Sequence, residues 1–191
     1  MVTPLANLIR YICKYDPRKN DLTEWRLNWL VYLSDWKHVL LTGCQITDIS
    51  WENYSRGPYS ERVLEEVKRY PNLFTLREIE WYSPMQKFFQ LLVEAFGMDP
   101  IRNDKLRDLV RKKIVTIVQL ANTQFEPYLT FHEQQAVDHV LRVAGRLPDD
   151  EFVRLVRSTY PAITQLKYEP LNLPALAKKY REEFPVDEYA H

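Results

Sequence analysis

The predicted fold is organised around the stretch EWRLNWLVYLSDWKHVLL, which runs from Glu24 to Leu41. Apolar residues recur in it with the period of a helix, and they occupy two faces of that helix at once. A helix that is apolar nearly all round is buried, so we expect this segment to be the central helix of the fold. The pattern Asp21-x-x-Glu24 has the spacing of a capping box, and Gly43 can adopt the left-handed conformation that ends helices.

Further helices are predicted on both sides of the central one, because prolines and glycines punctuate the chain between apolar stripes. They are expected to end by Tyr15, to cover Ser50–Tyr54 and Ser60–Arg69, and to begin at Ser83, near Leu106, at Thr130, at Pro148 and near Pro174. β-Branched and aromatic residues allow one short β segment near residues 73–82. The predicted fold class is mainly α: a compact, single-domain helical bundle of about eight or nine helices around a buried central helix.

The length and the charge balance restrict the classes of protein that fit. A chain of 191 residues is compatible with one domain, since domains average roughly 150 residues. We expect residues 1–191 to form that domain, with a flexible C-terminal tail at residues 185–191. The chain has 26 Lys and Arg residues against 26 Asp and Glu residues, so it lacks the long-range field that attracts nucleic acid.

The sequence also predicts where the protein resides. No apolar run approaches the ~20 residues that span a membrane, and the N-terminus lacks the pattern of a signal peptide. The cysteines, Cys13 and Cys44, form no CxxC pair, and each lies in an apolar setting where a free thiol acts as a small hydrophobe. We therefore expect a soluble, cytoplasmic protein that makes no contact with a membrane.

No pattern in the sequence predicts catalysis or metal binding. The zinc-binding helix motif needs histidines four residues apart, and the residue four positions after His132 is Ala136. The four glycines form neither a phosphate-binding loop nor the strained turn of a serine or cysteine nucleophile. We therefore expect a protein that is not an enzyme, with no metal site and no cofactor.

Asp35 interrupts the otherwise apolar central helix, where an unpaired buried carboxylate would cost several kcal/mol. Two interpretations are open. Asp35 lies at the edge of the helix and reaches water, or it is a structural polar residue that pairs with a basic side chain such as Arg56. In the second case it would fix the turn at Gly57-Pro58 against the central helix.

The first third of the chain carries a resemblance to a known family. The stretch Arg26–Trp36, then Gly43, then Ile46-Thr47, and then the run Tyr54-Ser-Arg-Gly-Pro-Tyr59 resembles the Panacea domain. This family includes the SocA-like antitoxins and many phage-associated proteins. The matching elements fall in order at Leu30, Tyr32, Asp35, Gly43, Tyr54, Gly57 and Pro58. The resemblance spans roughly residues 22–182, and it is loose over residues 72–128.

The resemblance implies an antitoxin of a toxin–antitoxin system, which neutralises a cognate protein toxin encoded beside it by direct protein–protein binding. Rigid aromatic and arginine side chains are typical of such a contact surface. The candidate partner-binding residues cluster around one turn in the sequence: Trp51, Tyr54, Arg56, Gly57, Pro58 and Tyr59. The alternative is that these aromatic residues complete the core.

Two other functions stay open at this point. One is a nucleic-acid-binding regulator that uses a basic helix face at residues 105–113, although the neutral overall charge makes nucleic acid an unfavourable partner. The other is a proteolytic adaptor, which the family resemblance also allows, with a protease as a second partner that receives the toxin.

Overall fold

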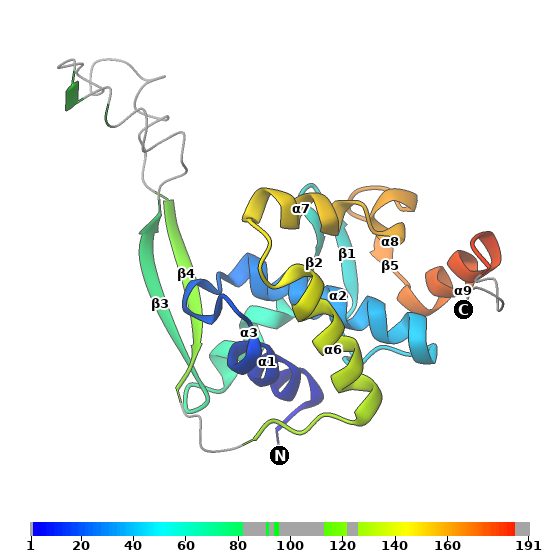
Figure 1. Cartoon of the computed structure of the whole chain (residues 1–191), viewed down its shortest axis with the longest axis horizontal. Coiled ribbons are helices and arrows are strands. Elements are labelled where there is room, and N and C mark those ends of the chain that lie inside the picture. The colour runs from blue at the N-terminus through cyan, green and yellow to red at the C-terminus, as the bar shows by residue number, and fades with distance from the viewer. Residues whose placement is uncertain (1, 82–90, 92–93, 96–112, 122–125, 186–191) are drawn as a thin grey trace. The chain divides into compact units, whose positions relative to one another are not determined.

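The computed structural model describes residues 2–81, 91, 94–95, 113–121 and 126–185 (Figure 1). Contacts within the chain divide it into two compact units. The first consists of Met1–Thr75 and Val118–His191, and the second of Leu76–Ile117. The predicted single domain over residues 1–191 stays a prediction, and the predicted tail lies outside the described residues from position 186 onward.

The first unit is mainly helical. Its helices are α1 (Pro4–Tyr15), the short 3-10 helix η1 (Lys19–Asp21), α2 (Glu24–Thr42), α3 (Arg62–Arg69), α6 (Phe131–Ala144), α7 (Asp149–Arg157), α8 (Tyr160–Thr164) and α9 (Leu173–Glu183). The described part of the chain thus contains seven α-helices, fewer than the eight or nine that were predicted. The predicted helix from Ser83 lies almost wholly outside the described residues.

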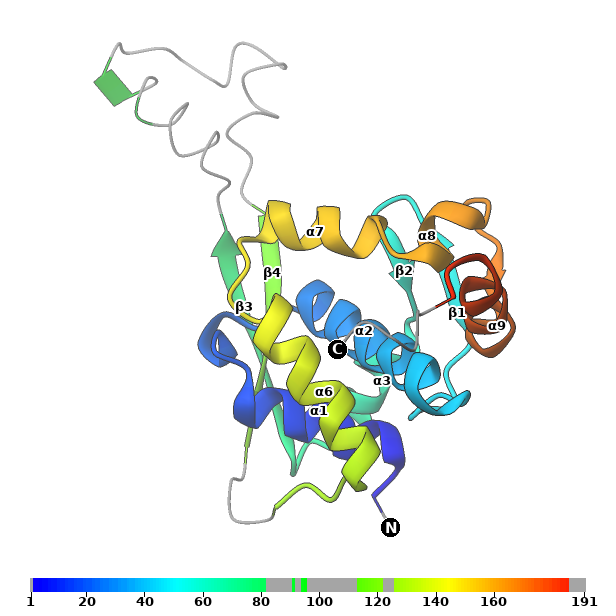
Figure 2. The same ribbon diagram turned by 45° about the vertical axis from the view of Figure 1, so that its right-hand side comes forward.

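Helix α2 runs through the centre of the first unit, as predicted (Figure 2). It contacts α1, α3, α6, α7 and α9, and Leu30, Val31 and Tyr32 have no exposed surface. The helix is capped by Thr23 rather than by the predicted Asp21, because the Thr23 hydroxyl accepts the N–H of Arg26, whereas Asp21 ends η1. The predicted end is confirmed: Gly43 has a φ of 87°.

Other local signals also produced the expected helix ends. Thr130 and Glu133 form a capping box at the start of α6. The Thr130 side chain accepts the backbone N–H of Glu133, and the Glu133 side chain accepts the backbone N–H of Thr130. The Asn172 side chain accepts the N–H of Ala175 at the start of α9, two residues before the proline that predicted this helix. Helix α8 was not predicted, because it is only five residues long.

A small antiparallel sheet replaces the helix that was predicted over Ser50–Tyr54. Its strands are β1 (Trp51–Tyr54), β2 (Gly57–Tyr59) and β5 (Pro170–Leu171), in the order β2-β1-β5. Burial alternates along β1, with Trp51 and Asn53 inside and Glu52 outside, as in a strand. Four residues are too few for sequence periodicity to separate that pattern from one turn of helix.

Strands β3 (Phe74–Trp81) and β4 (Lys113–Leu120) pair in a separate two-stranded sheet. β3 confirms the predicted β segment near residues 73–82. β4 overturns part of the helix predicted from Leu106, because the five consecutive β-branched residues Ile114–Val118 favour an extended chain. Residues 105–112 of the predicted basic face lie outside the described residues. No helix within the described ranges is both long and apolar enough to cross a membrane.

Candidate partner-binding surface

Asp35 is a buried anchor between α2 and the segment that leads into β1. It has no exposed surface, and its Oδ1 accepts the N–H groups of Ile46 and Thr47 at 3.0 Å each. Its Oδ2 accepts the Thr47 hydroxyl at 2.5 Å and the Trp51 indole N–H at 3.0 Å. Burial raises the pKa of Asp35, and the hydrogen bonds that it accepts oppose that rise.

Asp35 is therefore structural, but both detailed interpretations of it are wrong. The carboxylate does not reach water, and its partners are backbone and neutral side-chain donors rather than Arg56. Neutral donors fully satisfy a buried carboxylate when enough of them converge, so no cation is needed. Sequence alone could not reveal this arrangement, because two of the donors are backbone N–H groups of a loop.

Three of the six predicted partner-binding residues lie inside the protein. Trp51 has no exposed surface and packs edge-on against Tyr32, with ring centroids 5.5 Å apart, so the prediction that it contacts a partner is corrected. Gly57 and Pro58 are buried as well. Gly57 has a φ of 113°, and a Cβ there would lie 2.8 Å from Cγ1 of Val156, so glycine is needed for the close approach to α7.

The other three predicted residues come together with two that sequence reasoning missed. We call these five the aromatic surface: Trp25, Tyr54, Arg56, Tyr59 and Tyr168. Ring centroids are 4.6 Å apart for Trp25 and Tyr59, 5.6 Å for Tyr59 and Tyr54, and 5.7 Å for Tyr54 and Tyr168. The Arg56 guanidinium carbon lies 5.5 Å from the Trp25 ring centroid. Four rings and one guanidinium thus form one continuous series of contacts.

The loop that presents Tyr168 is held in place by Asn53 of β1. The Asn53 amide donates to the carbonyl oxygens of Ala162 at 3.1 Å and Gln165 at 2.8 Å, and the Asn53 carbonyl accepts the N–H of Tyr168 at 2.7 Å. Tyr168 is 66% exposed and has a φ of 66°, a conformation that non-glycine residues rarely adopt. A strained residue held by specific hydrogen bonds is a rigid way to present a ring.

Two hollows flank Tyr54, and they carry opposite charge. One, which we call the cationic hollow, has a volume of about 400 Å³ and is lined by Arg157 and Lys167 without any carboxylate. The acidic hollow has a volume of about 320 Å³ and is lined by Glu52, Glu61, Glu65 and Arg62, and Arg62 forms an ion pair with Asp48. The aromatic surface therefore separates a positive depression from a negative one.

The phenols of Tyr54 and Tyr59 stay protonated at neutral pH. The pKa of Tyr54 is raised chiefly by the charge of Glu52, and the pKa of Tyr59 is raised by burial and by the charge of Glu24. Their hydroxyl groups can therefore donate hydrogen bonds to a partner. Among the described residues, no group of three or more His, Cys, Asp or Glu side chains is placed to hold a metal ion.

The described part of the chain is mainly helical, with a continuous cluster of aromatic side chains that includes Tyr54 and Tyr59. The family model described as antitoxin SocA-like, Panacea domain, matches residues 27–161, which is more than half of the chain. The chain therefore belongs to this family, and membership indicates a role in a toxin–antitoxin pair. The match includes Tyr54, Arg56 and Tyr59, whereas Trp25 and Tyr168 lie just outside it. No curated protein and no solved structure gives a significant match.

Proposed function

We propose that the protein is an antitoxin that neutralises a cognate protein toxin by binding it directly, with the aromatic surface as its contact site. The proposal requires no catalytic group and no cofactor. It extends the family membership by naming the mode of neutralisation and the residues that perform it.

The observation that carries the proposal is the continuous contact among the side chains of the aromatic surface. They come from three separate parts of the chain: α2, the β1–β2 hairpin and the loop before β5. Tyrosine, tryptophan and arginine carry most of the binding energy in protein interfaces, because they bury a large area with few rotatable bonds. Side chains that are already in contact also lose little conformational entropy when a partner arrives.

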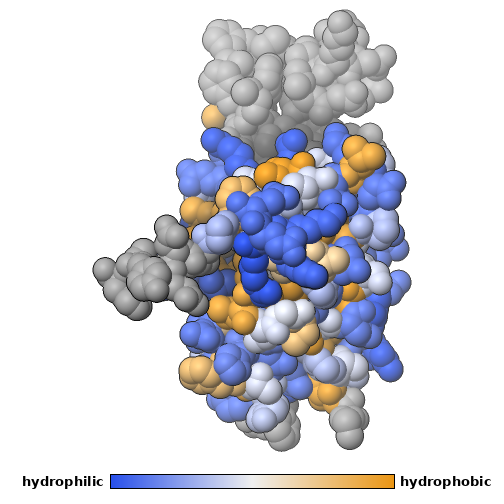
Figure 3. All heavy atoms as spheres, turned by 90° about the vertical axis from the view of Figure 1, so that its right-hand side faces the viewer, coloured by the Kyte–Doolittle hydropathy of each residue, from blue (hydrophilic) through white to orange (hydrophobic). Residues whose placement is uncertain are grey.

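Exposed hydrophobicity alone does not distinguish this surface. On the face of the molecule that carries α9, hydrophobic residues are scattered among hydrophilic ones (Figure 3). Protein interfaces differ from other surfaces by their aromatic anchors more than by bulk hydrophobicity. The two hollows of opposite charge beside Tyr54 add a means of orienting a toxin that carries complementary charges.

The test is coexpression with the toxin encoded beside the protein, combined with a binding measurement on the purified pair. The double variant Tyr54→Ala with Tyr168→Ala should abolish growth rescue and weaken toxin binding by at least about 100-fold, as expected for two interface anchors. Tyr128→Ala is the matched control, because Tyr128 is 76% exposed but lies outside the aromatic surface. Full rescue by the double variant would refute this contact site.

The route of neutralisation is tested in the same cells. Direct binding predicts that the toxin persists at an unchanged level in a stable complex with the antitoxin. A toxin that disappears when the antitoxin is present, and returns when cellular proteases are inhibited, would instead favour the proteolytic adaptor and would contradict neutralisation by binding alone.

A further inference from the structure

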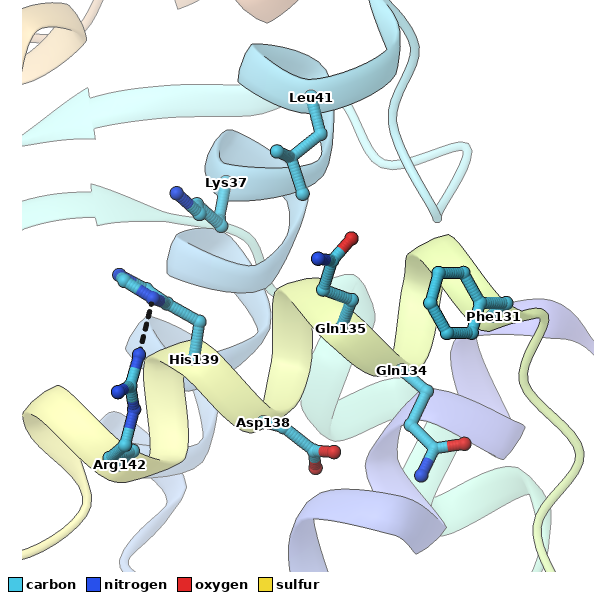
Figure 4. A pocket seen from close by; sticks show the side chains of 8 residues that line it. All are labelled: Lys37, Leu41, Phe131, Gln134, Gln135, Asp138, His139 and Arg142. Carbon is cyan, nitrogen blue, oxygen red and sulfur yellow. Dashed lines mark hydrogen bonds between the residues drawn. The ribbon is translucent and has the colours of Figure 1, made fainter. Parts of the chain in front are cut away.

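A further depression lies between α2 and α6, and it shares no residue with the aromatic surface. We call it the α2–α6 groove, and its volume is about 700 Å³ (Figure 4). Lys37 and Leu41 line it from α2. The side chains that line it from α6 are Phe131, Gln134, Gln135, Asp138, His139 and Arg142. Peptide and ligand sites typically have volumes of about 300–1,000 Å³, so the groove can hold a few side chains of a partner.

The groove combines exposed apolar side chains with a group of basic ones. Leu41 is 43% exposed and Phe131 is 76% exposed. Lys37, His139 and Arg142 gather together, away from Phe131 (Figure 4). A partner would therefore meet apolar surface and positive charge at different places in the same groove.

Among the described residues, no carboxylate forms an ion pair with the cations of the groove. Arg142 donates to Nδ1 of His139 at 3.1 Å, so that nitrogen is an acceptor and the imidazole is neutral. Burial, together with the charges of Lys37 and Arg142, lowers the pKa of His139. Neither Lys37 nor Arg142 forms an ion pair with any described residue.

The one carboxylate that lines the groove is already engaged elsewhere. The Tyr11 hydroxyl donates to Oδ1 of Asp138 at 2.7 Å, and Asp138 points away from Lys37, His139 and Arg142 (Figure 4). Asp138 keeps its negative charge, but the side of the groove that holds Lys37, His139 and Arg142 is lined by basic side chains (Figure 4). A carboxylate placed among these three side chains would accept hydrogen bonds from Arg142 and Lys37 and relieve the repulsion between them.

We propose that the α2–α6 groove is a second interaction surface, which binds an acidic peptide segment of a partner protein. Carboxylates of that segment pair with Lys37 and Arg142, and an apolar side chain beside them packs against Leu41 and Phe131. Nucleic acid fits less well, because its binding relies on neutralising many phosphates with Lys and Arg, whereas two cations, Lys37 and Arg142, line this groove.

The first experiment uses the full chain and a dye-labelled peptide that alternates glutamate with leucine, measured by fluorescence polarisation. The peptide should bind, and the same peptide with lysine in place of glutamate should not. The charge reversals K37E and R142E should each weaken binding by at least about tenfold. The control K178E reverses an exposed charge on α9, outside the groove, and should leave the affinity unchanged.

The second experiment reads the site directly, at the imidazole that contacts Arg142. Saturation with the glutamate peptide should raise the pKa of His139 in an NMR titration, since a nearby carboxylate favours the protonated imidazole. The variant H139Q assigns the signal. A pKa that stays constant, equal binding of the lysine peptide, or stronger binding of an oligonucleotide would each overturn the proposal.

A third variant separates a partner in trans from the chain's own acidic residues near its end. Arg181 donates to the carbonyl oxygens of Val39 and Leu40, so the end of α9 lies beside the end of α2. If the peptide binds only to the variant D187K/E188K, the groove serves the protein's own segment, and the proposed partner in trans is refuted. Equal affinity of this variant and the unchanged protein supports the proposal.

Discussion

The indole N–H of Trp51 donates to the carboxylate of Asp35 at 3.0 Å, and neither side chain has any exposed surface. The two residues are 16 positions apart, one in the central helix and one in the first strand. Their hydrogen bond joins β1 to α2 inside the protein. Because Tyr54 ends that strand, Asp35 supports the aromatic surface although it cannot touch a partner.

Replacement of Asp35 by asparagine should destabilise the protein by about 2–4 kcal/mol. An asparagine amide offers one acceptor oxygen, so in one orientation its NH₂ group faces the N–H groups of Ile46 and Thr47, and in the other it faces the indole N–H of Trp51. The free energy of unfolding in urea, followed by tryptophan fluorescence, measures the loss. Asp48→Asn is the matched control, because the Asp48 side chain is 79% exposed. This variant should change the free energy of unfolding by less than about 0.5 kcal/mol. Equal stability of the two variants would contradict the anchor role of Asp35.

Replacement of Arg26 should destabilise the protein at least as much as replacement of Asp35, because the buried Arg26 guanidinium caps the end of α6. It is 1% exposed and donates to the carbonyl oxygens of Ala144 at 3.1 Å, Gly145 at 2.6 Å and Leu147 at 3.1 Å. Arg26→Met leaves the Gly145 carbonyl without its donor, although Ala144 keeps the N–H of Leu147 and the Leu147 carbonyl keeps Arg18. The substitution also removes the cation nearest to the buried Asp16, so we expect a loss of about 3–5 kcal/mol.

Lysine should not restore this stability, since one ammonium group cannot reproduce the planar fork of arginine. Arg154→Met provides the comparison, because Arg154 forms an exposed ion pair with Asp150 and should change the unfolding free energy by less than about 1 kcal/mol. The prediction fails if Arg26→Lys unfolds at the same urea concentration as the unchanged protein.

The lowered pKa of His139 makes stability depend on pH. The folded protein binds a proton at this imidazole less readily than the unfolded chain, whose histidine has a pKa of about 6.5. The resulting contribution to stability is present above pH 6.5 and is lost as the pH falls through the lower pKa of the folded state. Urea unfolding over this interval should show a decline that His139→Gln removes. A decline of the same size in the variant would assign it to another group.

Sequence patterns predicted the parts of the fold that depend on local interactions. Helix α2 follows from its all-round apolar pattern, its end follows from Gly43, and the start of α6 follows from the capping box of Thr130 and Glu133. Each of these signals lies within a few residues of the structure it specifies. The Panacea resemblance is likewise contained in one contiguous stretch, and the family match over residues 27–161 confirms it.

The features that were missed depend on residues far apart in the sequence. The carbonyl partners of Arg26 lie 118 or more positions later in the sequence, and four of the described helices lie between Tyr54 and Tyr168. Sequence periodicity does not predict contacts between residues so far apart in the chain. Trp51 was assigned to the surface because it neighbours Tyr54 in sequence, whereas alternation along β1 sends the two side chains into different environments.

Tyr168 allows the backbone strain of the aromatic surface to be separated from its contact with the toxin. Its φ of 66° costs a residue with a Cβ roughly 1–2 kcal/mol, which glycine avoids. Tyr168→Gly should therefore be more stable than Tyr168→Ala by about 1 kcal/mol in urea unfolding, after allowance for the greater entropy of unfolded glycine. Both variants lack the ring that packs on Tyr54, so both should bind the toxin equally weakly in calorimetry. Equal stability of the two would show that the backbone is unstrained, and undiminished binding by either would remove Tyr168 from the contact site.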